Sequence, residues 1–236
     1  MARHYYYWIT ALPAPPHLGA TPPMSPHELL EHVAEAPIPH ALIEALLLGD
    51  DLLQREAAMA GECATPTPSV LTQAQMTQET PLPEYLVPGA TDHAPRVAAD
   101  ATWAAYYRHT AAVAEQWGSE FLGAWTRHEV GLRNALAESR AKSLGLEPGD
   151  YQVCPDAGED PEGFDAIIAE WSGAPDPLAG LKVLDRARWA WIDRNEAWFT
   201  FEKDELVAYG ARLLLLNRWE RLSESARTSA SLGRNE

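Results

Sequence analysis

The chain has 236 residues, of which 46% are hydrophobic, and a formal net charge of −16 at pH 7. Its length and its nine tryptophans are sufficient for a folded protein with a large core. The negative charge argues against a surface for nucleic acid or anionic lipid, because both need clustered basic side chains. We therefore expect an acidic, folded protein with no nucleic-acid partner.

The cysteine and hydropathy patterns indicate a protein of the cytoplasm. Cys63 and Cys154 lie far apart, and neither belongs to a Cys-x-x-Cys pair, so we expect reduced thiols rather than a disulfide framework. The N-terminus lacks the long apolar core of a signal peptide. No run approaches the ~18 apolar residues of a membrane span. We expect a cytoplasmic protein that would reach a membrane only through partner proteins.

The composition changes near residue 100. The first 100 residues hold 14 of the 19 prolines but only three of the 18 lysines and arginines. This shift predicts a loop-rich N-terminal part over residues 1–98, a compact helical domain over 99–222 and a flexible tail over 223–236. The expected fold is mostly all-α, a multi-helix bundle with a proline-rich N-terminal part.

Three segments with local signals precede the proline-rich stretch. The apolar run Tyr5–Leu12 fits a strand or a short buried helix. Residues 26–35 are predicted to be a helix, with Ser25 as its N-cap and a proline at its first position. Residues 39–60 favour another helix, which we expect to be interrupted or capped near Gly49-Asp50-Asp51.

Residues 61–98 are rich in threonine and proline, with little periodicity and few charges. Proline interrupts regular structure because it lacks a backbone N–H and restricts the residue before it. We predict a long loop or a partly disordered arm, although such long loops are uncommon inside compact domains.

The rest of the chain is predicted to be helical. The expected helices span residues 99–117, 121–144, 164–171, 177–194 and 202–222. Gly145 is a suitable C-cap for the second of these helices, and Asp176 is a suitable N-cap for the fourth. The middle of the last helix is apolar nearly all round, which indicates burial on several sides or an interface. The residues assigned to this possible interface are Leu213, Leu214, Leu215 and Leu216.

Charged side chains lie on the apolar face of the helix predicted over 121–144. At about 100° per residue, Glu129, Arg133 and Arg140 share an arc with its apolar residues. Those apolar residues are Leu122, Trp125, Leu132 and Leu136. Charged side chains are seldom fully buried without a partner. Glu129 and Arg133 are four residues apart in the favourable order for an ion pair, and Arg188 has a similar position on its own helix.

Three interpretations of these charges stay open. They form an internal ion network that fixes the helix register, they dock onto another molecule, or a Glu/Arg pair acts as a catalyst in a cleft. The residues assigned to the network or interface are Glu129, Arg133, Asn134, Arg140, Arg188, Trp125, Trp189 and Trp191. We favour the internal network, followed by the docking surface.

The catalytic motifs that the chain approaches all fail on spacing. His27 and His32 are five residues apart, about 140° around a helix, whereas a zinc-protease helix needs two histidines four residues apart. The glycines at 118 and 123 have the spacing of a phosphate-binding loop, but the Lys-Ser/Thr that holds phosphate and Mg²⁺ does not follow them. We predict no catalytic residue, no cofactor and no metal site.

Three stretches, taken in order, resemble a known bacterial family. The first is Tyr5-Tyr-Tyr-Trp-Ile-Thr-Ala-Leu-Pro, followed by Met24-Ser-Pro-His-Glu-Leu-Leu. The second is Glu129-Val-Gly-Leu-Arg-Asn-Ala-Leu-Ala-Glu-Ser-Arg. The third runs from Asp176-Pro-Leu to Arg218-Trp-Glu-Arg. Over residues 4–222 the chain resembles a domain-of-unknown-function family whose genes tend to lie among those of bacterial V/A-type ATPases.

The resemblance implies a non-catalytic component of a V/A-type rotary ATPase, an enzyme of proton or sodium transport. Its counterpart in that enzyme is the all-helical socket that couples the rotor shaft of the central stalk to the membrane ring. The implied partners are the ATPase subunits that form this shaft and ring. Two alternatives remain: a small-molecule enzyme or binding protein with a Glu129/Arg133/Arg140 cleft, and a self-associating adaptor with Leu213–Leu216 buried between copies.

Overall fold

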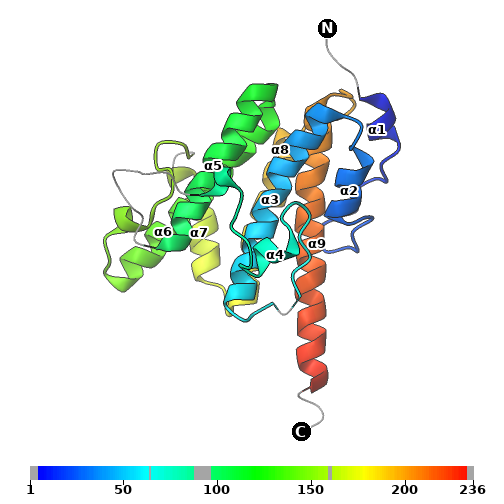
Figure 1. The fold of residues 1–236 in the computed structure, drawn as a ribbon. Helices are drawn as coiled ribbons and strands as arrows, with labels where there is room; N and C mark the ends of the chain where they lie inside the picture. The colour runs from blue at the N-terminus through cyan, green and yellow to red at the C-terminus, as the bar shows by residue number, and fades with distance from the viewer. Residues whose placement is uncertain (1–4, 64, 88–96, 159–160, 233–236) are drawn as a thin grey trace.

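The computed structural model describes residues 5–63, 65–87, 97–158 and 161–232, without the side chains of 161–162 and 224–232. This part of the chain forms nine α-helices and three short 3-10 helices, and it contains no strand. The predicted all-α, multi-helix architecture is confirmed (Figure 1).

The N-terminal segments are short helices. Residues Tyr6–Thr10 form α1, so the first apolar run is a helix and not a strand. Helix α2, Pro26–His32, begins at the predicted N-cap, Ser25. The Ser25 side chain accepts a hydrogen bond from the Glu28 N–H, and the Glu28 carboxylate accepts one in return from the Ser25 N–H.

Helix α3, Pro37–Met59, runs unbroken through Gly49, where an interruption was expected. Gly49 is needed for packing rather than for a turn, because a Cβ at this position would lie 2.6 Å from the hydroxyl oxygen of Tyr106. Asp50 and Asp51 do not end the helix either, because both are buried with partners that satisfy their carboxylates. The sequence Gly-Asp-Asp therefore marks a crossing of two helices.

The described part of the stretch 61–98 is more regular than expected. It contains helix α4, Gln73–Met76, and a 3-10 helix, Glu84–Leu86. The Asp51 carboxylate accepts hydrogen bonds from the backbone N–H groups of residues 69, 70 and 71, each at 2.8 Å. These bonds tie the segment to α3, while Leu71, Met76 and Leu86 fill the gap beneath it. Residues 88–96 lie outside the described residues.

The C-terminal helices appear where the sequence predicts them. They are α5 Ala98–Trp117, α6 Glu120–Leu144, α7 Asp165–Ser172, α8 Pro177–Asn195 and α9 Lys203–Leu232. Two 3-10 helices, Pro148–Tyr151 and Pro161–Phe164, lie between α6 and α7. Helix α9 continues ten residues past Leu222, so most of the predicted flexible tail is helical backbone that extends beyond the other helices (Figure 1).

Helices α3 and α9 pack against each other in the middle of the bundle. Helix α3 also contacts α5, while α9 contacts α2, α6 and α8 (Figure 1). Their shared core therefore joins the proline-rich N-terminal part to the C-terminal helices. Among the described helices, none combines the length and apolar composition needed to cross a bilayer.

Candidate functional site

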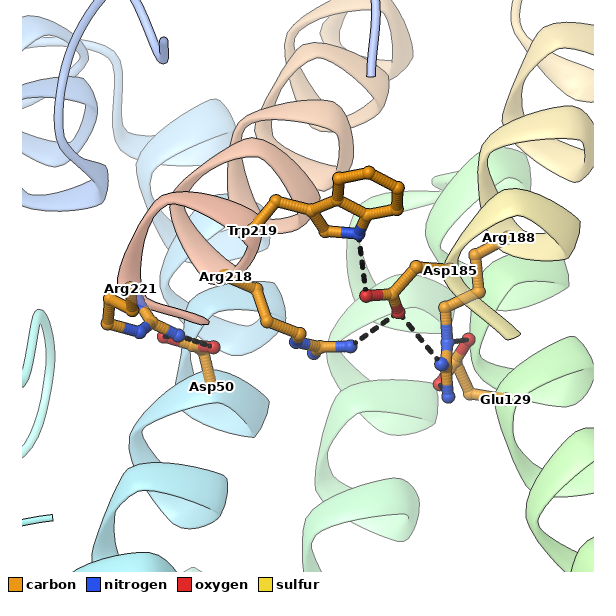
Figure 2. A network of polar contacts seen from close by, with 7 residues as sticks. All are labelled: Asp50, Glu129, Asp185, Arg188, Arg218, Trp219 and Arg221. Atoms are coloured by element: carbon orange, nitrogen blue, oxygen red, sulfur yellow. Dashed lines mark hydrogen bonds and ion pairs between the residues drawn. The ribbon is translucent and has the colours of Figure 1, made fainter. Parts of the chain in front are cut away.

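Six charged side chains meet where α3, α6, α8 and α9 come together. We call them the central ion network (Figure 2). Its members are Asp50, Glu129, Asp185, Arg188, Arg218 and Arg221. Three carboxylates and three guanidinium groups balance in formal charge. The network therefore places charges inside the bundle without a net charge, which lowers the cost of burying them.

Glu129 on α6 forms a two-point ion pair with Arg188 on α8. Arg188 donates from Nε to Oε1 at 2.7 Å and from Nη2 to Oε2 at 3.0 Å. Burial opposes ionisation of Glu129, but the adjacent guanidinium overcomes this and holds the pKa of the carboxyl below its ordinary value. The expected Glu129–Arg133 pair is therefore wrong, because a partner on a neighbouring helix offers both oxygens a donor.

Asp185 links α8 to α9. Its side chain is fully buried and accepts hydrogen bonds from Arg188 Nη1 at 3.2 Å, Arg218 Nη1 at 3.0 Å and the Trp219 indole N–H at 3.0 Å. Figure 2 shows these donors converging on it from two helices. A carboxylate held by three donors is compensated for its loss of water.

Asp50 carries the network to α3. Both of its oxygens accept hydrogen bonds from Arg221 Nη2, at 2.7 and 2.9 Å, and Gln54 donates to the same carboxylate at 2.9 Å. Asp50 and Arg221 are 171 positions apart in sequence. The network thus connects the N-terminal and C-terminal parts of the chain.

Arg133 lies outside these contacts and pairs with α5. It donates to Asp100 at 2.8 Å, and its guanidinium stacks 4.8 Å from the ring centroid of Trp103. Its side chain is 31% exposed. The prediction that Arg133 takes part in the ion pairs of the bundle is confirmed, but its partner is Asp100.

Two other predicted residues have separate positions. Arg140 is exposed and stacks on Trp171 of α7 at 5.1 Å, so its placement on the buried face is wrong. The helix surface has turned toward solvent by this last stretch of α6. Asn134 is buried and holds the loop after α6, because it donates to the Val153 carbonyl at 2.9 Å and accepts from the Val153 N–H at 2.8 Å.

The predicted tryptophans divide between core and surface. Trp125 and Trp191 are buried and pack edge-to-face, with ring centroids 5.5 Å apart. Trp189 is half-buried, and the Arg212 guanidinium stacks on it at 4.8 Å. The two core tryptophans act in packing, whereas Trp189 supports the surface described below.

The four leucines proposed as an interface are buried inside the chain itself. Leu213, Leu215 and Leu216 are 1% exposed and Leu214 is 7% exposed. Helix α9 is covered there by its own neighbours in the bundle. The interpretation of Leu213–Leu216 as an interface is therefore wrong, and the burial interpretation of the same apolar stretch is correct.

Exposed aromatic side chains gather at the end of the molecule that holds α1 and the α8–α9 loop. We call Tyr6, Tyr7, Trp198 and Phe199 the aromatic cap. Their exposed fractions are 52%, 73%, 51% and 80%. The two segments are joined by a hydrogen bond of 2.7 Å from the Tyr5 N–H to the Phe201 carbonyl, and the Tyr6 and Phe201 rings lie 4.3 Å apart. Large apolar groups left in water together are typical of binding surfaces.

The loop of the aromatic cap is held in an unusual conformation. Phe199 and Phe201 have φ values of 60° and 55°, in the left-handed region that bulky side chains rarely adopt. The Glu205 carboxylate stabilises this conformation by accepting hydrogen bonds from the N–H groups of both residues. Such local strain clusters at functional sites.

Arg212 supports the aromatic cap from below. It is 5% exposed, it donates to Asp193 at 2.6 Å, and it forms an ion pair with Glu196. Its guanidinium also lies 5.7 Å from the ring centroid of Trp198. The cap is therefore fixed to α9 by contacts inside the bundle.

Four members of the central ion network were not predicted from the sequence. They are Asp50, Asp185, Arg218 and Arg221, although each lies in or beside an apolar stretch. The spacing of Asp185 to Arg188, and of Arg218 to Arg221, is three residues, which places each pair on one helix face. Among the described residues, no group of three or more His, Cys, Asp or Glu side chains could hold a metal ion.

Comparisons of the chain with protein families, with curated proteins and with solved structures give no match. The function must therefore be inferred from the geometry and chemistry of the chain itself.

Proposed function

We propose that this chain is a non-catalytic assembly subunit that binds partner proteins through its aromatic cap. The observation that carries this proposal is a contrast between two sets of side chains. The charges of the central ion network pair with one another, whereas four aromatic side chains of the cap face water. Aromatic residues contribute large contact areas at protein interfaces, where they often dominate the binding energy.

The pairing within the network supports a structural role for its charges. Glu129 uses both oxygens on Arg188, and Asp185 accepts from three donors. A catalytic carboxylate needs contact with a substrate atom, and a side chain locked on both oxygens offers less of its surface for that role. The network holds four helices in register and so keeps the cap in place.

The partner that we propose is a V/A-type rotary ATPase, in which the chain would act as the socket between the rotor shaft and the membrane ring. This part of the proposal rests on the family resemblance of residues 4–222. The all-helical fold is compatible with a socket. Such a protein would meet the membrane through the ATPase and would stay in the cytoplasm.

Co-purification from the native host tests the function. Tagged wild-type chain should bring down the rotor-shaft and membrane-ring subunits of the ATPase. Replacement of two cap residues, Trp198→Ser with Phe199→Ser, should abolish this capture without unfolding the protein, because both side chains are more than half exposed. Leu144→Ser is the matched control, since Leu144 is 71% exposed at the end of α6, and it should retain capture. Wild-type chain that captures no ATPase subunit would overturn the proposal.

A further inference from the structure

A small cavity lies beside the central ion network. It has a volume of about 140 Å³ and is lined by residues of α3, α5, α6, α8 and α9. Much of its wall is apolar or aromatic, including Leu53, Trp103 and Leu214. Leu53 is 38% exposed, so the cavity opens to solvent on the α3 side. The cavity is therefore accessible to a small molecule.

One wall of this cavity carries a tyrosine whose hydroxyl has no protein partner. Tyr107 is 6% exposed and lines the cavity. No residue in the described part of the chain forms a hydrogen bond with its hydroxyl. Burial raises the pKa of Tyr107, and the carboxylate of Glu129 adds to this effect. The hydroxyl therefore stays protonated and can donate, and a donor in such a site gains from an acceptor that enters it.

Two arginines of the lining add further donors. Arg218 donates to Asp185 from Nη1, and Arg133 donates to Asp100 from Nη2. Within the described ranges, neither guanidinium donates from its other nitrogens. Arg188 differs, because its three nitrogens all donate to carboxylates. The cavity thus has unused N–H groups on two sides.

The charges of the lining favour a negative ligand. Three arginines, Arg133, Arg188 and Arg218, face two acids, Asp50 and Glu129, which leaves one positive charge in excess. Guanidinium groups match the geometry of a carboxylate well. The volume sets the size of the ligand, because an engineered protein cavity of about 150 Å³ holds one benzene molecule.

We propose that this cavity binds a small monocarboxylate with an apolar body, of about the size of benzoate. The Tyr107 hydroxyl and the unused nitrogens of Arg133 and Arg218 bind the carboxylate, and the apolar wall holds the body. This ligand site lies apart from the aromatic cap. It adds a small-molecule signal or stabiliser to an assembly protein, and it does not depend on the identity of the partner.

Titration with benzoate tests the site in the full chain. Thermal unfolding and isothermal titration calorimetry should show saturable binding at one site per chain. Tyr107→Phe should weaken benzoate binding about fivefold, because it removes one hydrogen bond. It should keep the fold, since the hydroxyl makes no hydrogen bond within the described protein. Tyr209→Phe is the matched control, because Tyr209 is also buried but lies outside this cavity, and its affinity for benzoate should equal that of the wild type.

A neutral probe of the same size separates charge recognition from simple filling of a void. Benzyl alcohol should bind at least tenfold more weakly than benzoate. Equal affinities for the two compounds would overturn the assignment of a carboxylate site. Absence of saturable benzoate binding, or unchanged binding in Tyr107→Phe, would overturn the site itself. Capture of partner proteins should be the same for Tyr107→Phe and the wild type, so this test fails or succeeds separately from the proposed function.

Discussion

Glu129 on α6 and Arg188 on α8 form a two-point ion pair at 2.7 and 3.0 Å, across 59 positions of sequence. Both side chains are less than one-fifth exposed. Arg188 also reaches Asp185, and through it Arg218 on α9. This pair is therefore the link by which α6 joins the other helices of the network.

Removal of either partner of this pair should destabilise the protein strongly. Glu129→Gln or Arg188→Met leaves a buried charge without compensation, a change that costs about 3–5 kcal/mol of unfolding free energy. The double variant should lose less than the sum of the two single losses. Urea denaturation measures all three values.

An exposed ion pair between α7 and α8 provides the control for that cycle. Arg186 and Glu170 lie 3.0 Å apart, with side chains 53% and 64% exposed. Glu170→Gln should change the unfolding free energy by about 0.5 kcal/mol or less. Equal effects of Glu170→Gln and Glu129→Gln would show that the buried network does not stabilise the fold.

Replacement of Gly49 by alanine should destabilise the bundle. An added Cβ would lie 2.6 Å from the Tyr106 hydroxyl oxygen, which is buried and cannot move aside easily. We expect a loss of about 1–3 kcal/mol, against a helix-propensity gain of up to about 1 kcal/mol. Gly123→Ala is the control, since its Cβ would have no neighbour closer than 3.5 Å. Gly123→Ala should leave stability unchanged or raise it, and a similar gain for Gly49→Ala would contradict the close crossing of α3 and α5.

Asp51 should make the protein more stable at pH 5 than at pH 7. Burial raises the pKa of Asp51 to about 6, against the backbone N–H bonds from residues 69–71 and with a contribution from Asp50. Because this folded value is above the ordinary 3.8, the folded state binds a proton that the unfolded state does not bind between pH 6 and pH 4. The gain from pH 7 to pH 5 is on the order of 1 kcal/mol.

Carboxyl NMR and urea denaturation check this prediction. The Asp51 carboxyl carbon should titrate with a midpoint near pH 6, and Asp51→Asn should remove the gain in unfolding free energy between pH 7 and pH 5. A midpoint near pH 4 with the same pH dependence in both proteins would contradict it.

Local signals in the sequence predicted most of the helices. Ser25 and Gly145 form the predicted helix boundaries, because capping depends on residues within one helical turn. The break expected at Gly49 did not occur, since the reason for this glycine is Tyr106 on another helix. The proline-rich stretch was predicted to be irregular, because the buried Asp51 that orders part of it lies in α3, before that stretch.

The site was predicted less fully than the fold for the same reason. The position of Glu129 and Arg188 on apolar helix faces was visible in the sequence, and both belong to the network. Their partners were not visible, because pairing depends on which helices are neighbours. The aromatic cap shows the same limit, since Tyr6 and Phe199 come from opposite ends of the chain and meet only after folding.

Photo-crosslinking in the native host decides whether the aromatic cap is the surface that binds partner proteins. A photoreactive phenylalanine analogue replaces Phe199 in one protein and Leu144 in another, since both side chains are highly exposed but lie on different elements. We expect crosslinks from position 199 to an ATPase subunit and none from position 144. Crosslinks from position 144 alone, or none from either position, would contradict the assignment of the cap as the binding surface.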